Sequence, residues 1–231
     1  MRHRPMIATD RISPNFDERA LPVSMIVLHY TGMPDAEGAI ARLTSSESKV
    51  SAHYVVTEEG AVLQLIDEQA RAWHAGKSYW RGISDVNSAS VGIEIVNPGH
   101  EFGYRPFPDD QIAALIPLVA EIKARHGIGR GNVVGHSDIA PTRKEDPGEL
   151  FPWPALARRR LALPSPERDL MDPYWTDAGF YLALERFGYD ISDNLKATIA
   201  FQRRFRPERI DGIVDGECRA KLLALLLPRP Q

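Results

Sequence analysis

Short apolar runs alternate with helical stretches along the first two thirds of the chain, and this alternation limits the fold more than any other feature. Residues Met25–Tyr30 (M-I-V-L-H-Y) and 91–96 (V-G-I-E-I-V) read as buried strands, and residues 133–134 as a shorter third one. Helical periodicity covers Asp109–His126, with two aspartates at its start and a glycine after its end. Strands interspersed with helices predict a mixed α/β domain, in which helices flank a central sheet.

Weaker signals complete this domain. A short helix is expected over residues 40–47. Apolar runs at 53–57 and 61–66 flank the letters E-E-G, which predicts a hairpin that turns at Gly60. Pro117 lies inside the long helical stretch, so we expect a kink or a break there, because proline removes a backbone donor and crowds the preceding turn.

A proline-marked segment divides the chain. Residues 163–173 contain three prolines among charged residues, which is the composition of a linker. We therefore expect one domain over residues 1–162 and a smaller, three-helix domain over residues 174–231. Its helical patterns cover residues 176–187, 193–205 and 215–226. Because few contacts should cross such a linker, a chain that ends near Leu163 is expected to fold by itself.

Composition excludes several classes of protein. The formal net charge is -3, so we expect no nucleic-acid partner. The single cysteine, Cys218, excludes an intrachain disulfide and a thiolate-rich zinc site. The late apolar run at 222–227 is too short to span a bilayer, and residues 1–11 lack the apolar stretch of a secretory signal. We expect a cytoplasmic protein, with a periplasmic one cut from a precursor as the alternative; the oligomeric state stays open.

Two histidines follow or end expected strands. His29 lies near the end of an apolar strand, where a polar ring reaches the rim of a sheet; taken alone, such a histidine is more often a satisfied core group. His136 follows the strand at 133–134 and opens the string G-H-S-D-I-A-P-T-R-K-E-D-P-G. In an extended segment, Lys144 and Asp146 would point to the same side. This arrangement indicates a metal site with an electrophilic helper, and a surface salt bridge is the plainer alternative.

Glu94 stands among apolar residues in the strand at 91–96. Strand alternation places Ile93 and Ile95 on one side and Gly92 and Glu94 on the other. A carboxylate is costly to bury unless it faces a cleft, a cation or water, and Gly92 leaves room beside it. An edge-strand glutamate that faces solvent is the alternative.

Together these residues resemble the zinc-dependent N-acetylmuramoyl-L-alanine amidases of the AmpD/AmiD type. The resemblance covers about residues 25 to 153. It rests on the strings V-L-H-Y-T, S-A-H-Y, W-H-A-G, V-G-I-E-I and G-H-S-D-I-A-P-x-R-K-x-D-P-G. The last string is long and specific. The resemblance implies hydrolysis of the amide bond between the lactyl group of N-acetylmuramic acid and L-alanine, with peptidoglycan or an anhydro-muropeptide as the substrate.

The resemblance also implies residue roles. His29, His136 and Asp146 would bind Zn²⁺ and leave a fourth position open, as in catalytic zinc sites. Glu94 would act as the general base, and Lys144 would stabilise the oxyanion. Recognition proteins that bind without cutting share the fold but lack the complete metal triad, so the complete set here favours catalysis.

Three further residues are candidate substrate contacts: Trp73, His74 and Asn97. Packing in the core is the alternative for Trp73 and His74. The C-terminal part resembles a small peptidoglycan-binding domain, through F-Q-R-R-F at 201–205 and the two D-G pairs that follow it. Phe201 and Phe205 share a helical face and are expected to be core residues, so the binding role depends on the resemblance alone.

Overall fold

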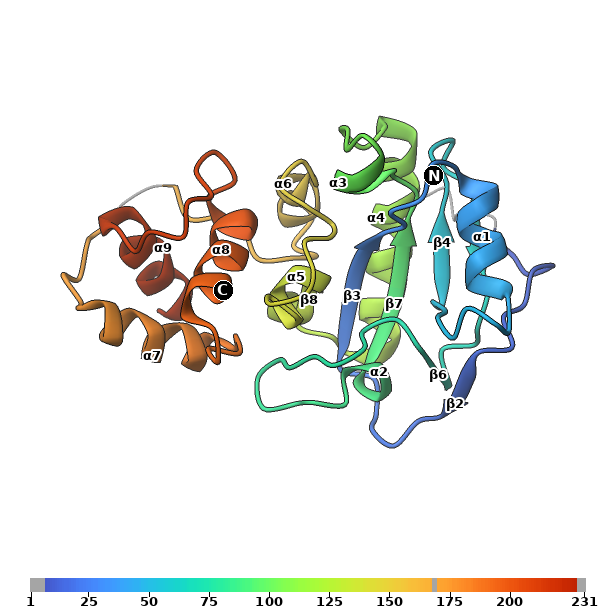
Figure 1. Cartoon of the computed structure of the whole chain (residues 1–231), viewed down its shortest axis with the longest axis horizontal. Helices are drawn as coiled ribbons and strands as arrows, with labels where there is room; N and C mark the ends of the chain where they lie inside the picture. Colours follow the sequence, from blue (N-terminus) through green and yellow to red (C-terminus); the bar gives the residue numbers. More distant parts are fainter. Residues whose placement is uncertain (1–6, 168–169, 228–231) are drawn as a thin grey trace.

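A six-stranded mixed sheet forms the centre of the molecule, with the strand order β1-β5-β4-β7-β3-β8 (Figure 1). The computed structural model describes residues 7–167 and 170–227. The expected domains and linker extend to residues 1–6, 168–169 and 228–231, which lie outside the described part. The mixed sheet flanked by helices is the fold class that the sequence predicts.

The elements have the following bounds. The strands of the sheet are β1 (Ile7–Ala8), β3 (Met25–Tyr30), β4 (Tyr54–Val56), β5 (Val62–Gln64), β7 (Ser90–Ile95) and β8 (Val133–Gly135), and β2 (Phe16–Glu18) pairs with β6 (Ala70–Ala72) in a separate antiparallel ribbon. The helices are α1 (Ala36–Thr44), α2 (Val86–Ala89), α3 (Gly99–Phe102), α4 (Asp109–His126), η1 (Arg130–Asn132), α5 (His136–Ile139), α6 (Trp153–Arg158), α7 (Asp177–Phe187), α8 (Asn194–Phe205) and α9 (Gly216–Leu226). Within the described residues, no helix has the length and apolar character needed to cross a bilayer.

Four neighbouring strands, β4, β7, β3 and β8, run parallel. Their carboxyl ends therefore meet at one edge of the sheet. The register places His29 of β3 opposite Glu94 of β7, and Leu28 of β3 opposite Gly135, the last residue of β8. His136 follows Gly135 directly. Pairing between strands thus brings three polar residues from distant parts of the sequence to one edge.

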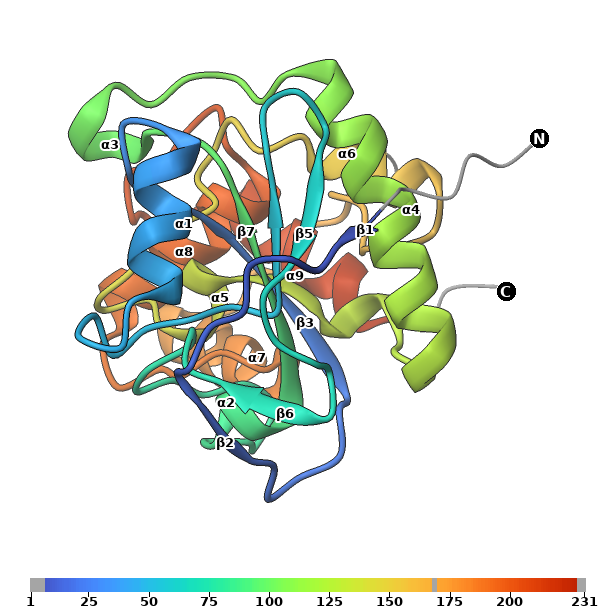
Figure 2. The ribbon, with the colours of Figure 1, turned by 90° about the vertical axis from the view of Figure 1, so that its right-hand side faces the viewer.

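One face of the sheet packs against α4 and α6. An apolar cluster fills the space between this face and the two helices. Ile26 and Leu28 of β3 and Ile93 of β7 belong to it, and α4 adds residues such as Leu115 and Leu118. Figure 2 shows α4 and α1 on opposite sides of the strands. Because side chains alternate along a strand, Met25, Val27 and His29 point to the other face.

That second face carries two apolar clusters. One lies under α1 and includes Ile40 and Leu43 of that helix. The other begins with Met25 and Val27 of β3 and continues into the C-terminal helices. His29 and Glu94 lie on this face, at its carboxyl edge, so the polar site is bordered by packed apolar groups.

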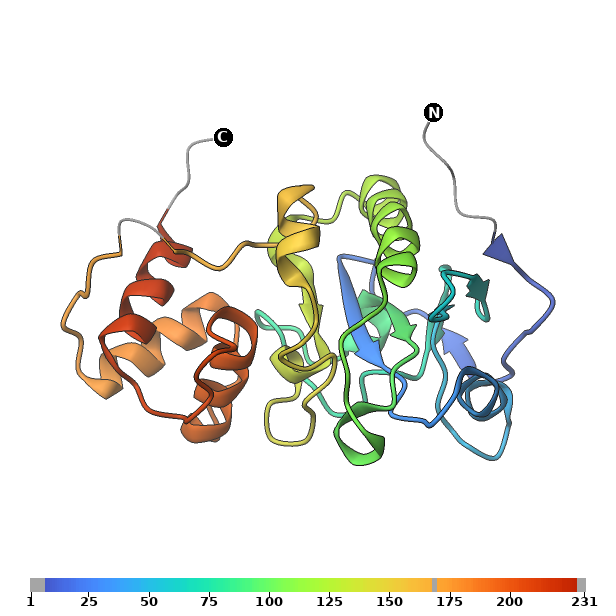
Figure 3. The ribbon, with the colours of Figure 1, turned by 90° about the horizontal axis from the view of Figure 1, so that it is seen from above.

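The three C-terminal helices α7, α8 and α9 lie next to the β8 edge of the sheet, beyond α5 (Figures 1 and 3). Phe180, Leu184 and Phe187 of α7 belong to the same buried cluster as Trp80 and Val134 of the larger domain. The two parts therefore share one core, and more contacts join them than the linker composition predicts.

Several expected elements are confirmed, and one expected helix has different bounds. The strand Met25–Tyr30, the helix Asp109–His126 and the β4–β5 hairpin are present. The helix expected at 40–47 spans Ala36–Thr44 instead, because the Asp35 side chain accepts the Gly38 N–H and starts the helix earlier. Pro117 does not break α4, which continues through it.

A buried carboxylate, Glu68, ties the hairpin side of the sheet to the end of α4. It accepts hydrogen bonds from Tyr54 of β4 and from Arg125 and His126 of α4. Burial raises the pKa of Glu68, but these hydrogen bonds outweigh burial and lower the pKa from 4.5 to about 2. The ionised carboxylate therefore stabilises the folded state.

We expect Glu68→Gln to destabilise the protein at neutral pH by about 1–3 kcal/mol, because the variant leaves the donors of Tyr54, Arg125 and His126 without an ionised acceptor. Because the folded-state pKa is lowered, this contribution is complete above pH 4.5 and disappears as the pH falls towards 2. Urea unfolding of wild type and variant at several pH values measures the difference. Glu58→Gln, at a more exposed pair with Arg105, is the control and should change stability little. A Glu68→Gln difference that does not depend on pH would contradict the prediction.

Candidate active site

A cavity of about 530 Å³ opens at the carboxyl edge of the parallel strands. All five residues that the sequence predicts for catalysis and metal binding line it: His29, Glu94, His136, Lys144 and Asp146. They come from β3, β7, the start of α5 and the loop after α5. The structure thus brings the five residues together.

Three donor atoms converge inside this cavity. The His29 Nδ1 lies 2.9 Å from the His136 Nδ1 and 3.0 Å from the Asp146 Oδ2, and the His136 Nδ1 lies 3.0 Å from the same carboxylate oxygen. All three residues are buried. The His136 Nε2 donates to the backbone carbonyl of Ala75, at 3.1 Å, which leaves the Nδ1 of a neutral imidazole without a proton.

The donor set fits a metal ion. A single proton can bridge only two of three atoms that face one another at such distances, whereas one cation satisfies all three. Two imidazole nitrogens and one carboxylate oxygen are ligands that zinc accepts, and they leave a fourth position for water or substrate.

The electrostatics of the three side chains suit this role. Burial lowers the pKa of His29 to about 4, so its imidazole is neutral at pH 7. For Asp146, burial opposes ionisation, but the neighbouring imidazoles of His136 and His29 outweigh burial and hold the pKa of the carboxyl far below its usual range. A neutral imidazole and an ionised carboxylate are the forms that bind metals.

Glu94 lies beside this set without being part of it. Its Oε2 atom is buried and has no hydrogen-bond partner among the described residues. Burial and then the charge of Asp146 raise the pKa of Glu94 well above its usual value, and the ammonium of Lys144 opposes that rise. A carboxyl group with such a raised proton affinity can exchange a proton with water in the cavity.

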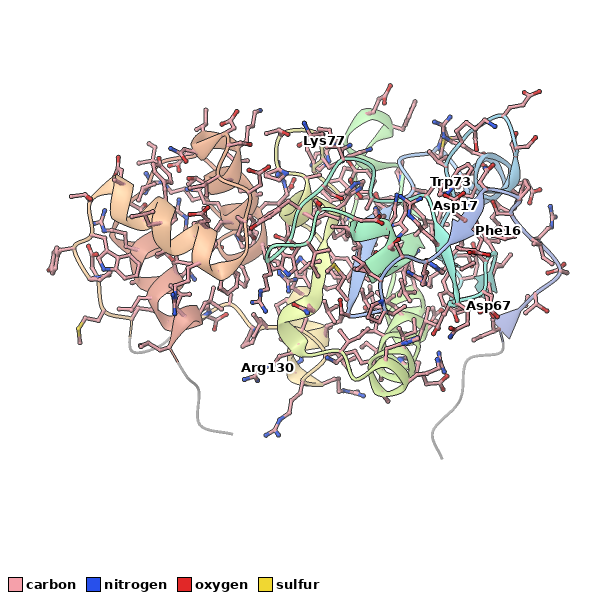
Figure 4. The ribbon with its side chains drawn as sticks, turned by 90° about the horizontal axis from the view of Figure 1, so that it is seen from below. Phe16, Asp17, Asp67, Trp73, Lys77 and Arg130 are labelled. Atoms are coloured by element: carbon pink, nitrogen blue, oxygen red, sulfur yellow. The ribbon has the colours of Figure 1, made fainter. Side chains whose placement is uncertain are left out.

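The three candidate substrate contacts lie in different settings. Trp73 is partly exposed on the cavity wall, and its indole N–H donates to Asp17 at 2.7 Å (Figure 4). His74 lines the cavity but is buried, and both its ring nitrogens have partners within the protein. The structure does not bring Asn97 to the cavity: it is fully buried, and its side-chain amide bonds to the backbone of Gly99 and Arg105.

Comparison with known proteins decides the family. The N-acetylmuramoyl-L-alanine amidase family matches residues 19–149, more than half of the chain. The amidase AmiD of Escherichia coli K12 is 37% identical over 88% of this chain and 82% of its own length. The chain belongs to the N-acetylmuramoyl-L-alanine amidase family.

Two further relatives describe the extent of the likeness. A solved complex of E. coli AmiD with anhydro-N-acetylmuramic acid-L-Ala-D-γ-Glu-L-Lys covers 91% of this amidase and 91% of that chain, with 36% identity and a TM-score of 0.79. The 1,6-anhydro-N-acetylmuramyl-L-alanine amidase AmpD of Haemophilus influenzae is 32% identical over 61% of this chain and 85% of its own length. The AmiD complex covers too much of the chain to match the larger domain alone, so the match includes C-terminal helices.

Sequence reasoning missed residues that shape the cavity of this amidase. Arg143 lines it, and its guanidinium holds the carbonyls of Ala75 and Lys77 in the facing loop. His100 also lines the cavity and contacts Tyr30 and Glu149. A usable signal was present: His100 follows the strand of Glu94 closely, and loops after the carboxyl ends of parallel strands gather at one edge.

Proposed function

We propose that this amidase hydrolyses the amide bond between the lactyl group of anhydro-N-acetylmuramic acid and L-alanine, with Zn²⁺ as cofactor, in cell-wall recycling. The observation that carries the proposal is the convergence of the His29 Nδ1, the His136 Nδ1 and the Asp146 Oδ2 at 2.9–3.0 Å beside Glu94. The relatives support the choice of substrate, because AmiD was solved with an anhydro-muropeptide and AmpD is named for the anhydro sugar.

His29, His136 and Asp146 would hold the metal. Bound zinc supplies Lewis acidity, which lowers the pKa of a water to about 7 and polarises a carbonyl oxygen. Glu94 takes a proton from the attacking water as the new C–O bond forms. It then passes that proton to the nitrogen of L-alanine as the C–N bond breaks, so that the lactyl carboxylate and a free amine leave.

Lys144 complements this chemistry electrostatically. Its side chain lines the same cavity, and its positive charge acts on both Glu94 and His29. No hydrogen bond or ion pair of its ammonium is recorded within the described residues, so the group is available to an oxyanion. We assign Lys144 to the developing negative charge on the scissile carbonyl oxygen.

Two substrates, digested in parallel, test the function. Soluble anhydro-muropeptide and intact sacculi are incubated with the zinc-loaded amidase, and the products are identified by mass spectrometry. We expect release of the intact peptide, beginning with L-alanine, from the anhydro sugar. Release from sacculi alone would change the proposed substrate to the polymeric wall, and absence of release from both would overturn the activity.

Metal removal should abolish activity. We expect one zinc per chain by elemental analysis, loss of both zinc and turnover on chelation, and recovery when zinc is returned. His29→Ala, His136→Ala and Asp146→Ala should each lower the zinc content, because each removes one of three protein ligands. Full turnover in metal-free protein would contradict zinc dependence.

The compartment and the C-terminal helices are separate questions. The cytoplasmic location expected from the sequence stays a prediction, and fractionation of cells that express the natural gene would test it. Wall binding by the C-terminal helices also stays a prediction. Co-sedimentation with sacculi tests it, with Glu94→Gln as the protein, because this variant should not digest the wall.

A further inference from the structure

The W-H-A-G segment, residues 73–76, contacts both imidazoles of the proposed metal site at their Nε2 atoms, on the side away from the converging Nδ1 atoms. The ring of His74 contacts His29, and the backbone carbonyl of Ala75 contacts His136. The backbone N–H groups of His74 and Ala75 both donate to the Asn87 side-chain oxygen, at 3.1 and 2.8 Å. One short loop segment, fixed by one asparagine, therefore lies against two of the three proposed ligands.

Hydrogen bonds connect His29 to His74, His74 to Ser90, and Ser90 to the backbone carbonyl of Val86. The donor and the acceptor of each bond follow from the last one. The carbonyl of Val86 can only accept, so the Ser90 hydroxyl, 2.6 Å away, donates to it. The Ser90 oxygen is then free to accept from the His74 Nε2, at 3.2 Å. His74 thus carries its ring proton on Nε2, and its Nδ1 accepts from the His29 Nε2, at 3.0 Å.

The direction of these hydrogen bonds determines which ring nitrogen of His29 carries no proton. With its proton on Nε2, His29 presents an unprotonated Nδ1 to His136 and Asp146. His136 reaches the same state by donating its Nε2–H to the Ala75 carbonyl. One ligand is oriented by a backbone carbonyl, which no substitution removes, and the other by the side chain of His74, which a substitution can remove.

Gly92 makes the position of His74 possible. A β-carbon at residue 92 would lie 2.4 Å from the Cγ of the His74 ring, much closer than contact allows. The room that the sequence indicates beside Glu94 is thus filled by this imidazole. The ring lies flush against β7, with 8% of the residue exposed.

We propose that His74 is a positioning residue rather than a substrate contact: with Ser90 behind it, it fixes the tautomer and orientation of the metal ligand His29. This inference rests on the proposed metal function of His29. Partners of this kind, behind a metal ligand, typically change metal affinity or activity by about 10–100-fold when they are removed.

Zinc affinity, measured by competition with a chelator, tests the inference without using activity. We expect His74→Leu to raise the Kd for Zn²⁺ by about 10–100-fold. His74→Asn should recover most of the affinity, because the asparagine oxygen can accept the His29 Nε2–H near the original Nδ1 position. Ser90→Ala should weaken zinc binding in the same direction, since His74 loses the acceptor that holds its proton on Nε2.

Ser13→Ala is the matched control. Ser13 is also fully buried and donates to a backbone carbonyl, that of Leu43, but it is remote from the metal ligands. The zinc affinity of the Ser13→Ala protein should equal that of wild type. In ¹⁵N-histidine spectra of the zinc-loaded wild type, His29 should carry its proton on Nε2.

The outcomes separate the two proposals. Failure of the wild type to bind zinc would overturn the proposed function itself. A wild type that binds zinc while His74→Leu and Ser90→Ala bind it equally tightly would overturn the role of His74 alone. If His74→Leu does not fold, Ser90→Ala and the spectrum of the wild type decide, and a His29 protonated on Nδ1 there contradicts the inference.

Discussion

Glu94→Gln is expected to lower turnover by about 10²–10⁴-fold, which is the usual loss when a general base is removed. Glutamine has the shape of glutamate, but its amide cannot take a proton from water. Glu94 lies outside the donor set of His29, His136 and Asp146, so the variant should still bind one zinc per chain. The measurement is kcat on soluble anhydro-muropeptide, together with zinc content and thermal stability.

Glu59→Gln provides the control for the loss of one negative charge. Glu59 is exposed in the β4–β5 turn, away from the cavity, and turnover should stay near the wild-type value. A zinc-loaded, folded Glu94→Gln protein with near-normal turnover would move the role of base to another group.

Phe187→Ala is expected to lower the free energy of unfolding of the whole protein by about 3–5 kcal/mol, the usual cost of a deleted core aromatic ring. Phe187 belongs to α7, yet it contacts Trp80 of the larger domain edge to face, with 6.1 Å between ring centroids. Backbone contacts add to this packing, because Arg81 donates to the carbonyls of Phe187 and Gly188.

Contacts between the C-terminal helices and the larger domain also involve the segment that carries two proposed zinc ligands, His136 and Asp146. The Tyr189 hydroxyl donates at 2.6 Å to Asp138, in the helix that begins with His136. Arg203 of α8 pairs with Glu145, next to Asp146. A chain that ends near Leu163 would expose the apolar surface around Trp80 and leave Asp138 buried without its tyrosine partner. We therefore expect such a chain to be strongly destabilised, in contrast to the expectation from the linker composition.

Urea unfolding, followed by fluorescence and by residual activity, measures whether the larger domain and the C-terminal helices unfold together. We expect a single shared transition in wild type and a coordinated shift of both signals in Phe187→Ala. Leu182→Ala is the control on the same helix: Leu182 is 65% exposed, so stability should change by less than about 0.5 kcal/mol. Two separate transitions, with activity unaffected by Phe187→Ala, would show that the two parts fold independently.

Local signals account for what the sequence predicted correctly. The strand Met25–Tyr30 and the helix Asp109–His126 follow from the spacing of their apolar residues and from the residues at the helix ends. Both signals act between residues that are a few positions apart in the chain. The start of α1 was missed because one capping side chain, Asp35, extends the helix beyond its apolar pattern. The ribbon of β2 and β6 was missed because each strand has only three residues and no regular pattern.

The sequence by itself determined the residue types of the site, since His29, Glu94, His136, Lys144 and Asp146 stand in long, specific strings. Only the tertiary structure decided which atoms converge. The pairing of β3 with β7 and β8 sets His29 opposite Glu94 and next to His136, and such register depends on contacts between distant segments. The place of His74 behind His29 and the core shared with α7 arise in the same way, because hydrogen-bond direction and packing exist only once the chain has folded.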